Sequence, residues 1–153
     1  MFKVKIVCVG ELNEKFYADA EREFEKRLSK FCKLEKVVVK ECSHLPTSQK
    51  ITAECAELSK HFVSPETAVL LSINAPLVTS EQVAELIKNK RDSQSHVEFF
   101  IGGSNGVSAE FEKMFKHKIS FGRLTLPHCL CKIVLEEQIY RAFSILNGSP
   151  YHK

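Results

Sequence analysis

Hydrophobic residues gather in short runs along the chain, and the first run sets the pattern. Residues 2–9 begin as an alternation of apolar and lysine positions and become fully apolar before Gly10, as expected of a strand that enters a sheet from its edge. Three consecutive valines within 36–41 stiffen the side chains and favour an extended, buried strand. Strands are therefore predicted at 2–9, 36–41, 67–73, 97–101 and 119–121.

Helical periodicity separates these strands. Between residues 14 and 31, apolar side chains recur every three or four positions with Glu, Arg and Lys between them. Thr79 and Gln82 have the spacing of a capping box, and Gly148 is a typical helix-ending residue. Helices are therefore predicted over 14–31, 51–62, onward from Thr79, 108–117 and 129–147.

The alternation of strands and helices predicts the architecture. Strands recur at intervals of roughly 30 residues, and a parallel strand pair needs such a crossover helix to return the chain. At 153 residues there is room for one domain, so residues 1–153 are expected to form a single α/β domain with a mainly parallel sheet flanked by helices. Ligands of such sheets bind beyond the carboxyl ends of the strands. Three loops with unusual sequences meet that description: 72–77, 102–107 and 122–128.

Composition removes several protein classes. With 44% hydrophobic and 27% charged residues, the chain has an ordinary globular composition. No apolar run approaches the ~20 residues of a membrane-spanning helix. Lysines interrupt the N-terminal apolar stretch, unlike in a signal peptide, so we expect a cytoplasmic protein that enters no membrane. The six cysteines include no CxxC pair and are expected to be free, small buried residues.

Positive charge is concentrated at the end of the chain. The net charge is only +3, but residues 113–153 hold 7 Lys and Arg against 2 Asp and Glu. A basic segment of this kind suits a surface that meets phosphates, and an ordinary solvated face is the alternative. The chain ends in Tyr151, His152 and Lys153, which form either a disordered tail or one that stacks on bases and holds phosphates.

Few residues indicate chemistry by themselves. The segment 102–106 contains three glycines, which permit close backbone approach to a ligand, and a plain tight turn is the alternative. It matches neither the dinucleotide fingerprint nor the P-loop and lacks a phosphate-binding lysine, which argues against phosphotransfer. His128 is a ligand contact, a proton carrier or a structural residue at a helix start. No metal-ligand spacing is present, so no metal is expected, and no GxSxG elbow surrounds Ser104 or Ser108.

Four segments together resemble one known family. The likeness spans the whole chain in length and element order, and its motifs lie in the C-terminal third. The chain is similar to the RlmH family, bacterial methyltransferases of the SPOUT superfamily that modify pseudouridine in large-subunit ribosomal RNA. The segments that carry this resemblance are Ile101-Gly102-Gly103-Ser104-Asn105-Gly106, Leu124-Thr125-Leu126-Pro127-His128, Glu137-Gln138-Ile139-Tyr140-Arg141-Ala142-Phe143 and Pro150-Tyr151-His152-Lys153.

The resemblance implies an activity, an assembly and a fold. An enzyme of this kind uses S-adenosylmethionine to methylate N3 of a pseudouridine in the decoding-centre helix of the large subunit, on the assembled ribosome. The resemblance also implies a homodimer and a C-terminal trefoil knot, an exception to the rule that chains do not thread their own loops. The alternative is a non-catalytic member of the same fold that binds the ribosome or its RNA.

The resemblance also assigns site residues. The cofactor pocket maps onto Leu71, Gly103, Gly122, Arg123, Leu124, Thr125, Leu126 and Pro127. The RNA contacts map onto Lys132, Arg141, Tyr151, His152 and Lys153. The groups expected to position the target base or stabilise its charge are Arg123, His128, His152 and Lys153.

Two positions depart from the family pattern. Family members commonly have Asp and then Gly after the leucine that corresponds to Leu71, whereas here that leucine is followed by Ser72-Ile73-Asn74-Ala75-Pro76. Lys132 stands where members often carry arginine, so a bidentate phosphate contact would be lost at that position.

Overall fold

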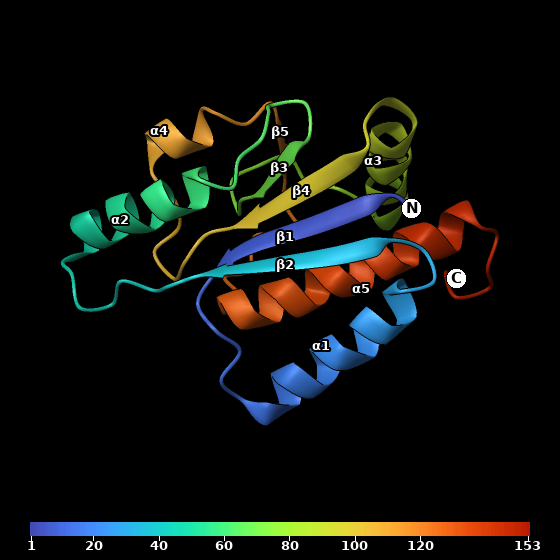
Figure 1. Ribbon diagram of the computed structural model, residues 1–153, viewed down its shortest axis with the longest axis horizontal. Coiled ribbons are helices and arrows are strands. Elements are labelled where there is room, and N and C mark those ends of the chain that lie inside the picture. Colours follow the sequence, from blue (N-terminus) through green and yellow to red (C-terminus); the bar gives the residue numbers. More distant parts are fainter.

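Five parallel strands form the centre of the protein (Figure 1). The computed structural model describes residues 1–153. The strand order is β2-β1-β4-β3-β5, and all four neighbouring pairs are parallel. This arrangement confirms the predicted α/β fold with a parallel sheet. The strands are β1 (Lys3–Val9), β2 (Lys33–Val39), β3 (Ala68–Leu71), β4 (His96–Ile101) and β5 (His117–Ile119).

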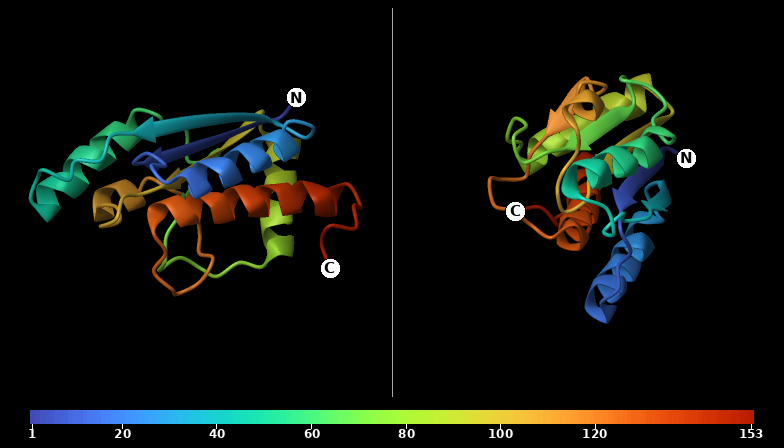
Figure 2. Two further views of the ribbon diagram at one scale, coloured as in Figure 1. Left: turned by 90° about the horizontal axis from the view of Figure 1, so that it is seen from below. Right: turned by 90° about the vertical axis from the view of Figure 1, so that its left-hand side faces the viewer.

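Helices cover both faces of this sheet. The helices are α1 (Lys15–Leu28), α2 (Thr47–Ser59), α3 (Ser80–Ser93), α4 (Ala109–Glu112) and α5 (His128–Leu146). One hydrophobic core joins the sheet to α1, α3 and α5, and a second joins the opposite face to α2 and α4 (Figures 1 and 2). Side chains alternate along each strand between these two cores, as shown by Ile6 in the first core and Val7 in the second. No helix is both long and apolar enough to cross a membrane.

Element boundaries differ from the sequence expectations around residue 115. The helix capped by Ser108 was expected to continue to 117 but ends at Glu112, because Phe115 turns into the second core and packs 5.2 Å from the ring centre of Phe100. The following strand spans His117–Ile119 rather than 119–121, since its partner β3 ends at Leu71, opposite Ile119. The capping box at Thr79 is present as expected.

All six cysteines are free, and four of them are buried. Cys42 and Cys131 are only half-buried, so the expected burial does not hold for these two. Burial raises the pKa of the Cys8 thiol to about 11, which keeps this thiol protonated and unreactive at neutral pH.

A cluster of charged side chains lies between α1, α5 and β2, inside the fold. The Lys132 ammonium is buried and lies 2.6 Å from a carboxylate oxygen of Glu21, which also pairs with Lys36 at 3.1 Å. Glu136, one turn further along α5, is completely buried. Burial and the nearby Glu21 carboxylate raise the pKa of Glu136 to about 8. Lys132 therefore completes an internal ion pair in this structure.

We predict that Glu136→Gln changes how stability depends on pH. The pKa of Glu136 rises from an ordinary 4.5 in the unfolded chain to about 8 in the fold, so the folded state holds the proton longer and loses stability as the pH rises through this window. A glutamine has no proton to lose, so the variant should gain a few kcal/mol relative to wild type between pH 5 and pH 8. Urea unfolding at both pH values measures this difference, and parallel pH profiles would contradict it.

Candidate active site

Three loops lie next to one another at the carboxyl edge of the sheet. Strand β3 lies between β4 and β5, so the loops that follow these three strands are neighbours. Backbone hydrogen bonds join the loop after β3 to the start of the loop after β5: the Ser72 amide donates to the Ile119 carbonyl at 3.0 Å, and the Ser120 amide donates to the Pro76 carbonyl at 2.9 Å. These are the three loops in which the sequence predicted a ligand.

The loop 102–106, called the glycine loop below, is a tight turn in which the position of Gly103 has no room for a side chain. The Gly106 amide donates to the Gly103 carbonyl at 2.9 Å, and Gly106 adopts φ +77, a conformation that favours glycine. A Cβ atom at Gly103 would lie 2.6 Å from the Oε1 atom of Glu54, a buried residue of α2. The loop is therefore a tight turn, and its backbone at Gly103 also lies close to the Glu54 carboxylate.

Arg123 connects the loop after β5 to the loop after β3. Its guanidinium donates hydrogen bonds to the backbone carbonyls of Ile73 and Ala75, the second at 2.9 Å. The Ser120 hydroxyl donates to the Gly122 carbonyl at 2.8 Å, and the Ile73 carbonyl oxygen lies 3.3 Å from the same hydroxyl. The segment that departs from the family pattern is therefore held by Arg123, whose charge is directed onto protein carbonyls here.

Exposed apolar side chains border these loops. Ile73, Leu77 and Leu124 are 39%, 58% and 82% exposed, although large hydrophobic residues are usually covered. An adenosyl group needs apolar contacts for its ring and backbone groups for its polar edge. The half-exposed backbone at Gly103 and the apolar rim fit that requirement, and the only cation among the mapped pocket residues is already engaged by carbonyls.

His128 lies beside a different part of the same edge. Its ring packs against Gly10 at the end of β1, where a Cβ would be 2.6 Å from Nε2. Together with residues 10–14 between β1 and α1 and with the end of β2, it borders a cleft of about 570 Å³. None of the mapped cofactor residues lines that cleft. His128 thus directly follows the mapped cofactor residue Pro127 in the sequence, but its ring lies against the end of β1.

The C-terminal tail packs on its own helix α5. The Tyr151 hydroxyl donates to Glu137 at 3.0 Å, and the Arg141 guanidinium lies 4.7 Å from the centre of the Tyr151 ring. Burial and the hydrogen bond to Glu137 raise the pKa of the Tyr151 hydroxyl. Tyr140 contacts the same ring edge-on at 4.8 Å. Two of the expected RNA contacts, Arg141 and Tyr151, therefore hold each other in place.

His152 joins the tail to α3 through both ring nitrogens. Nδ1 lies 3.2 Å from an Arg141 nitrogen, and Nε2 lies 2.8 Å from a carboxylate oxygen of Glu81. Because a guanidinium only donates hydrogen bonds, Nδ1 accepts, and Nε2 carries the proton donated to Glu81. This hydrogen bond lowers the pKa of Glu81. In this arrangement neither ring nitrogen of His152 is free to reach a substrate without releasing a partner.

The tail and the mapped cofactor loops of one chain lie at opposite ends of α5. The loop 122–127 leads into the first residue of this helix, and the tail follows its last turn (Figure 2). The helix has 19 residues, which at about 1.5 Å per residue separates its ends by about 27 Å. Leu71 ends β3, Gly103 follows β4 and the segment 122–127 follows β5, so all of them lie at the carboxyl edge of the sheet. The expected RNA contacts lie instead in the C-terminal part of α5 or beyond it: Arg141, Tyr151, His152 and Lys153.

Several residues of this arrangement were given no role in the site by the sequence interpretation. They are Glu54 and Lys50 on α2, Ser120 after β5, and Glu81 and Glu137, which hold the tail. One pattern does carry a usable signal: Lys50 and Glu54 share a helix face with the buried residues Cys55 and Leu58, although charged residues avoid buried faces. No group of three or more His, Cys, Asp or Glu side chains is arranged to hold a metal ion.

Comparisons with known proteins match the chain from end to end. A family model described as "Predicted SPOUT methyltransferase" matches residues 2–152. A protein of Oenococcus oeni is 38% identical over 160 residues, covering 100% of both chains, and one of Caldicellulosiruptor saccharolyticus is 36% identical, covering 98% of this chain and 99% of its own. A Mycoplasma mycoides protein is 40% identical, with 99% of each chain covered. All three are named ribosomal RNA large subunit methyltransferase H. The chain belongs to the SPOUT methyltransferase family, in the group of these large-subunit methyltransferases.

Proposed function

We propose that this protein transfers a methyl group from S-adenosylmethionine to N3 of a pseudouridine in large-subunit ribosomal RNA, on the assembled ribosome. The main support is the end-to-end likeness to relatives named for large-subunit ribosomal RNA methylation. The adjacent loops after β3, β4 and β5 agree with this proposal, since they offer glycine backbone and apolar side chains of the kind that an adenosyl group requires.

The cofactor is proposed to lie against Leu71, Gly103 and the segment Gly122, Arg123, Leu124, Thr125, Leu126 and Pro127. S-adenosylmethionine supplies an already activated methyl group, so the protein's main task is to align the acceptor nitrogen. Arg123 contributes by holding the loop after β3 in place through two carbonyls. Leu124 and Ile73 offer exposed apolar surface on the two loops that Arg123 joins.

The acceptor nitrogen carries a proton that has to leave before or during methyl transfer. A nearby cation that stabilises the resulting ring anion, or a base that accepts the proton, would lower the barrier. We assign this role to the tail, with Lys153 as the exposed cation and His152 as a group that the tail network orients. His128 remains a candidate for contact with the base from the side of β1.

A site that contains both the cofactor loops and the tail needs two copies of the chain. Within one chain these parts are separated by the 19-residue helix α5, a distance of about 27 Å. The tail is therefore proposed to reach the cofactor loops of a partner in a homodimer. Arg141 and Tyr151 would orient that tail, with Lys153 meeting RNA phosphates or the target base. Lys132 is left out of the RNA contacts, because its ammonium is buried against Glu21.

The proposal is tested by cofactor binding and by the modified nucleoside. Calorimetric titration should give saturable binding of S-adenosylmethionine and none of ATP or NAD. Ribosomes incubated with protein and cofactor should then yield a monomethylated pseudouridine in large-subunit RNA, detected by mass spectrometry of the digested nucleosides. Ribosome binding with no methyl transfer, at any cofactor concentration, would instead support the non-catalytic alternative.

A further inference from the structure

Helix α2 approaches the glycine loop from the face of the sheet opposite α5, and two of its charged residues are unusually well buried there. Lys50 and Glu54 lie one turn apart on the same side of the helix. Glu54 is 1% exposed and Lys50 is 8% exposed. Burial of charged side chains is unfavourable unless they are paired, so the partners of Lys50 and Glu54 indicate why these residues are buried.

Lys50 joins two loops through one ammonium group. Its Nζ donates to the Ser104 hydroxyl at 2.9 Å and to the Asn105 side-chain oxygen at 3.1 Å, both in the glycine loop. Its third contact, at 3.1 Å, is with the carboxylate of Glu41 in the loop between β2 and α2. An ammonium has three donors, so all of them are used to fix these two loops relative to α2.

Glu54 joins the same two loops one turn further along. Its Oε2 atom accepts a hydrogen bond from the Cys42 amide at 3.0 Å, in the loop that also contains Glu41. Its Oε1 atom faces Gly103 so closely that a Cβ there would be 2.6 Å away, and this oxygen has no hydrogen-bond partner in the chain. Glu54 therefore sets how close the backbone at Gly103 comes to α2.

We propose that Lys50 and Glu54 are positioning residues that hold the glycine loop in the conformation that binds S-adenosylmethionine. The inference rests on the proposed function, since it takes the glycine loop as part of the cofactor site. Neither residue needs to touch the cofactor for this role. Their shared contacts make the glycine loop and the loop between β2 and α2 move as one unit with α2.

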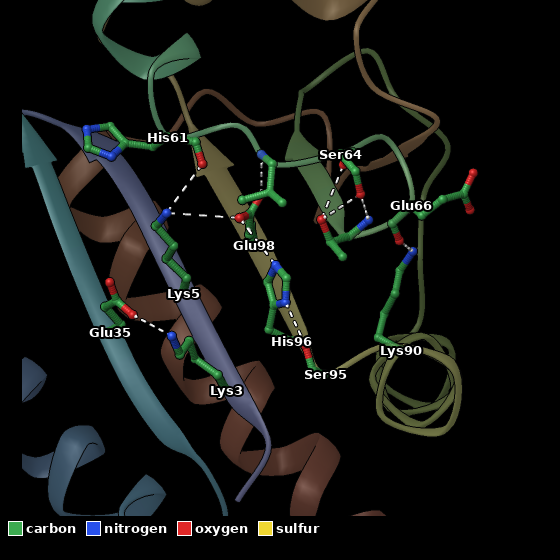
Figure 3. A network of polar contacts seen from close by, with 12 residues as sticks. Lys3, Lys5, Glu35, His61, Ser64, Glu66, Lys90, Ser95, His96 and Glu98 are labelled. Carbon is green, nitrogen blue, oxygen red and sulfur yellow. Dashed lines mark hydrogen bonds and ion pairs between the residues drawn. The ribbon is translucent and has the colours of Figure 1, made fainter.

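A buried pair in the sheet itself, Lys5 and Glu98, provides a matched control. Glu98 on β4 is completely buried, accepts a hydrogen bond from the Val63 amide at 3.2 Å and also has an unpartnered Oε1 atom. The Glu98 Oε1 atom lies 3.5 Å from the His96 ring and 4.0 Å from the Lys5 ammonium. The side chain of Lys5 is 14% exposed, compared with 10% for Lys50. Lys5 on β1 and Glu98 on β4 lie side by side in the sheet (Figure 3), and each is the third residue of its strand. The glycine loop begins only after the last residue of β4, Ile101.

The test compares the two pairs in full-length protein. Lys50→Met and Glu54→Ala should each weaken S-adenosylmethionine binding about tenfold or more, because the first removes the ammonium bound to Ser104 and Asn105 and the second removes the carboxylate packed against Gly103. Glu54→Gln, which keeps an acceptor for the Cys42 amide and a similar volume against Gly103, should retain most of the affinity. Lys5→Met and Glu98→Ala should lower the melting temperature to a similar degree without changing the dissociation constant.

Amide hydrogen exchange provides the second measurement, independent of the cofactor. Lys50→Met should speed exchange at residues 103–107 while leaving the central strands protected, and Lys5→Met should not. Unchanged affinity in folded Lys50→Met, or an equal loss of affinity in Lys5→Met, would overturn the inference. Wild-type protein that binds no S-adenosylmethionine would overturn the proposed function instead, and the exchange data would still decide whether Lys50 and Glu54 hold the loop.

Discussion

A chain that ends at Pro150 is expected to bind S-adenosylmethionine as tightly as the full-length protein and to methylate ribosomes at least about a hundredfold more slowly. The mapped cofactor residues lie at one end of α5, and the three deleted residues lie beyond the other end. Removal of the tail should therefore leave the cofactor loops intact and take away the groups that position the target base. Calorimetry and a single-turnover methylation assay measure the two effects separately.

Mixed dimers show whether the missing tail acts within its own chain or across the interface. A chain without the tail and a full-length chain with Gly103→Ala should each retain little activity alone, provided that S-adenosylmethionine is kept well below the dissociation constant of the Gly103→Ala variant. If the tail serves the partner, a mixed dimer contains one complete site, made from the cofactor loops of the first chain and the tail of the second. Unfolding and refolding the two together should then restore about a quarter of the wild-type activity, because half of the dimers are mixed and each has one working site.

The outcomes of this experiment separate three arrangements. No recovery in verified mixed dimers would mean that the tail acts on its own chain and has to leave Glu81 and Glu137 to do so. Full activity of the truncated chain alone would remove the tail from the mechanism. Because Tyr151 packs against Tyr140, the melting temperature of the truncated chain serves as the folding control, and Lys153→Ala gives a milder version of the same test.

The sequence predicted the sheet well because burial leaves a local pattern. Strands β1, β3 and β4 are buried on both faces and are therefore read from continuous apolar runs. The loops predicted to bind a ligand begin where these apolar runs end, so the same pattern also located the loops. The strand after α4 was harder to predict from the sequence. It begins at His117, where β3 provides a pairing partner, whereas the hydrophobic pattern begins only at Ile119.

Charged residues were harder to interpret, because their partners lie far away in the sequence. Lys132 looks like a surface cation when only its neighbours in the chain are considered, but Glu21, more than a hundred positions earlier, draws it inside the fold. Arg123 likewise has its carbonyl partners 48 and 50 positions earlier, in the loop after β3. A cation of the basic C-terminal segment therefore becomes an RNA contact, a loop clamp or an internal ion pair depending on pairings that only the fold decides.

Gly103→Ala is expected to weaken S-adenosylmethionine binding at least about tenfold, with a stability loss of about 1–3 kcal/mol, because the added Cβ is forced against a buried carboxylate. Gly106→Asn should do far less, although it lies in the same turn. Gly106 needs φ +77, which asparagine tolerates, and nothing lies within 4 Å of a Cβ at that position.

The contact between the Glu54 carboxylate and a Cβ atom at position 103 can be tested with a double variant. If contact with the Glu54 carboxylate causes the loss in Gly103→Ala, then Glu54→Ala opens space for the new Cβ. The double variant should consequently bind S-adenosylmethionine more tightly than the sum of the two single losses allows. Strictly additive losses would mean that Gly103 is needed for its contact with the cofactor alone. A positive coupling would instead show that α2 determines which residue the glycine loop can carry.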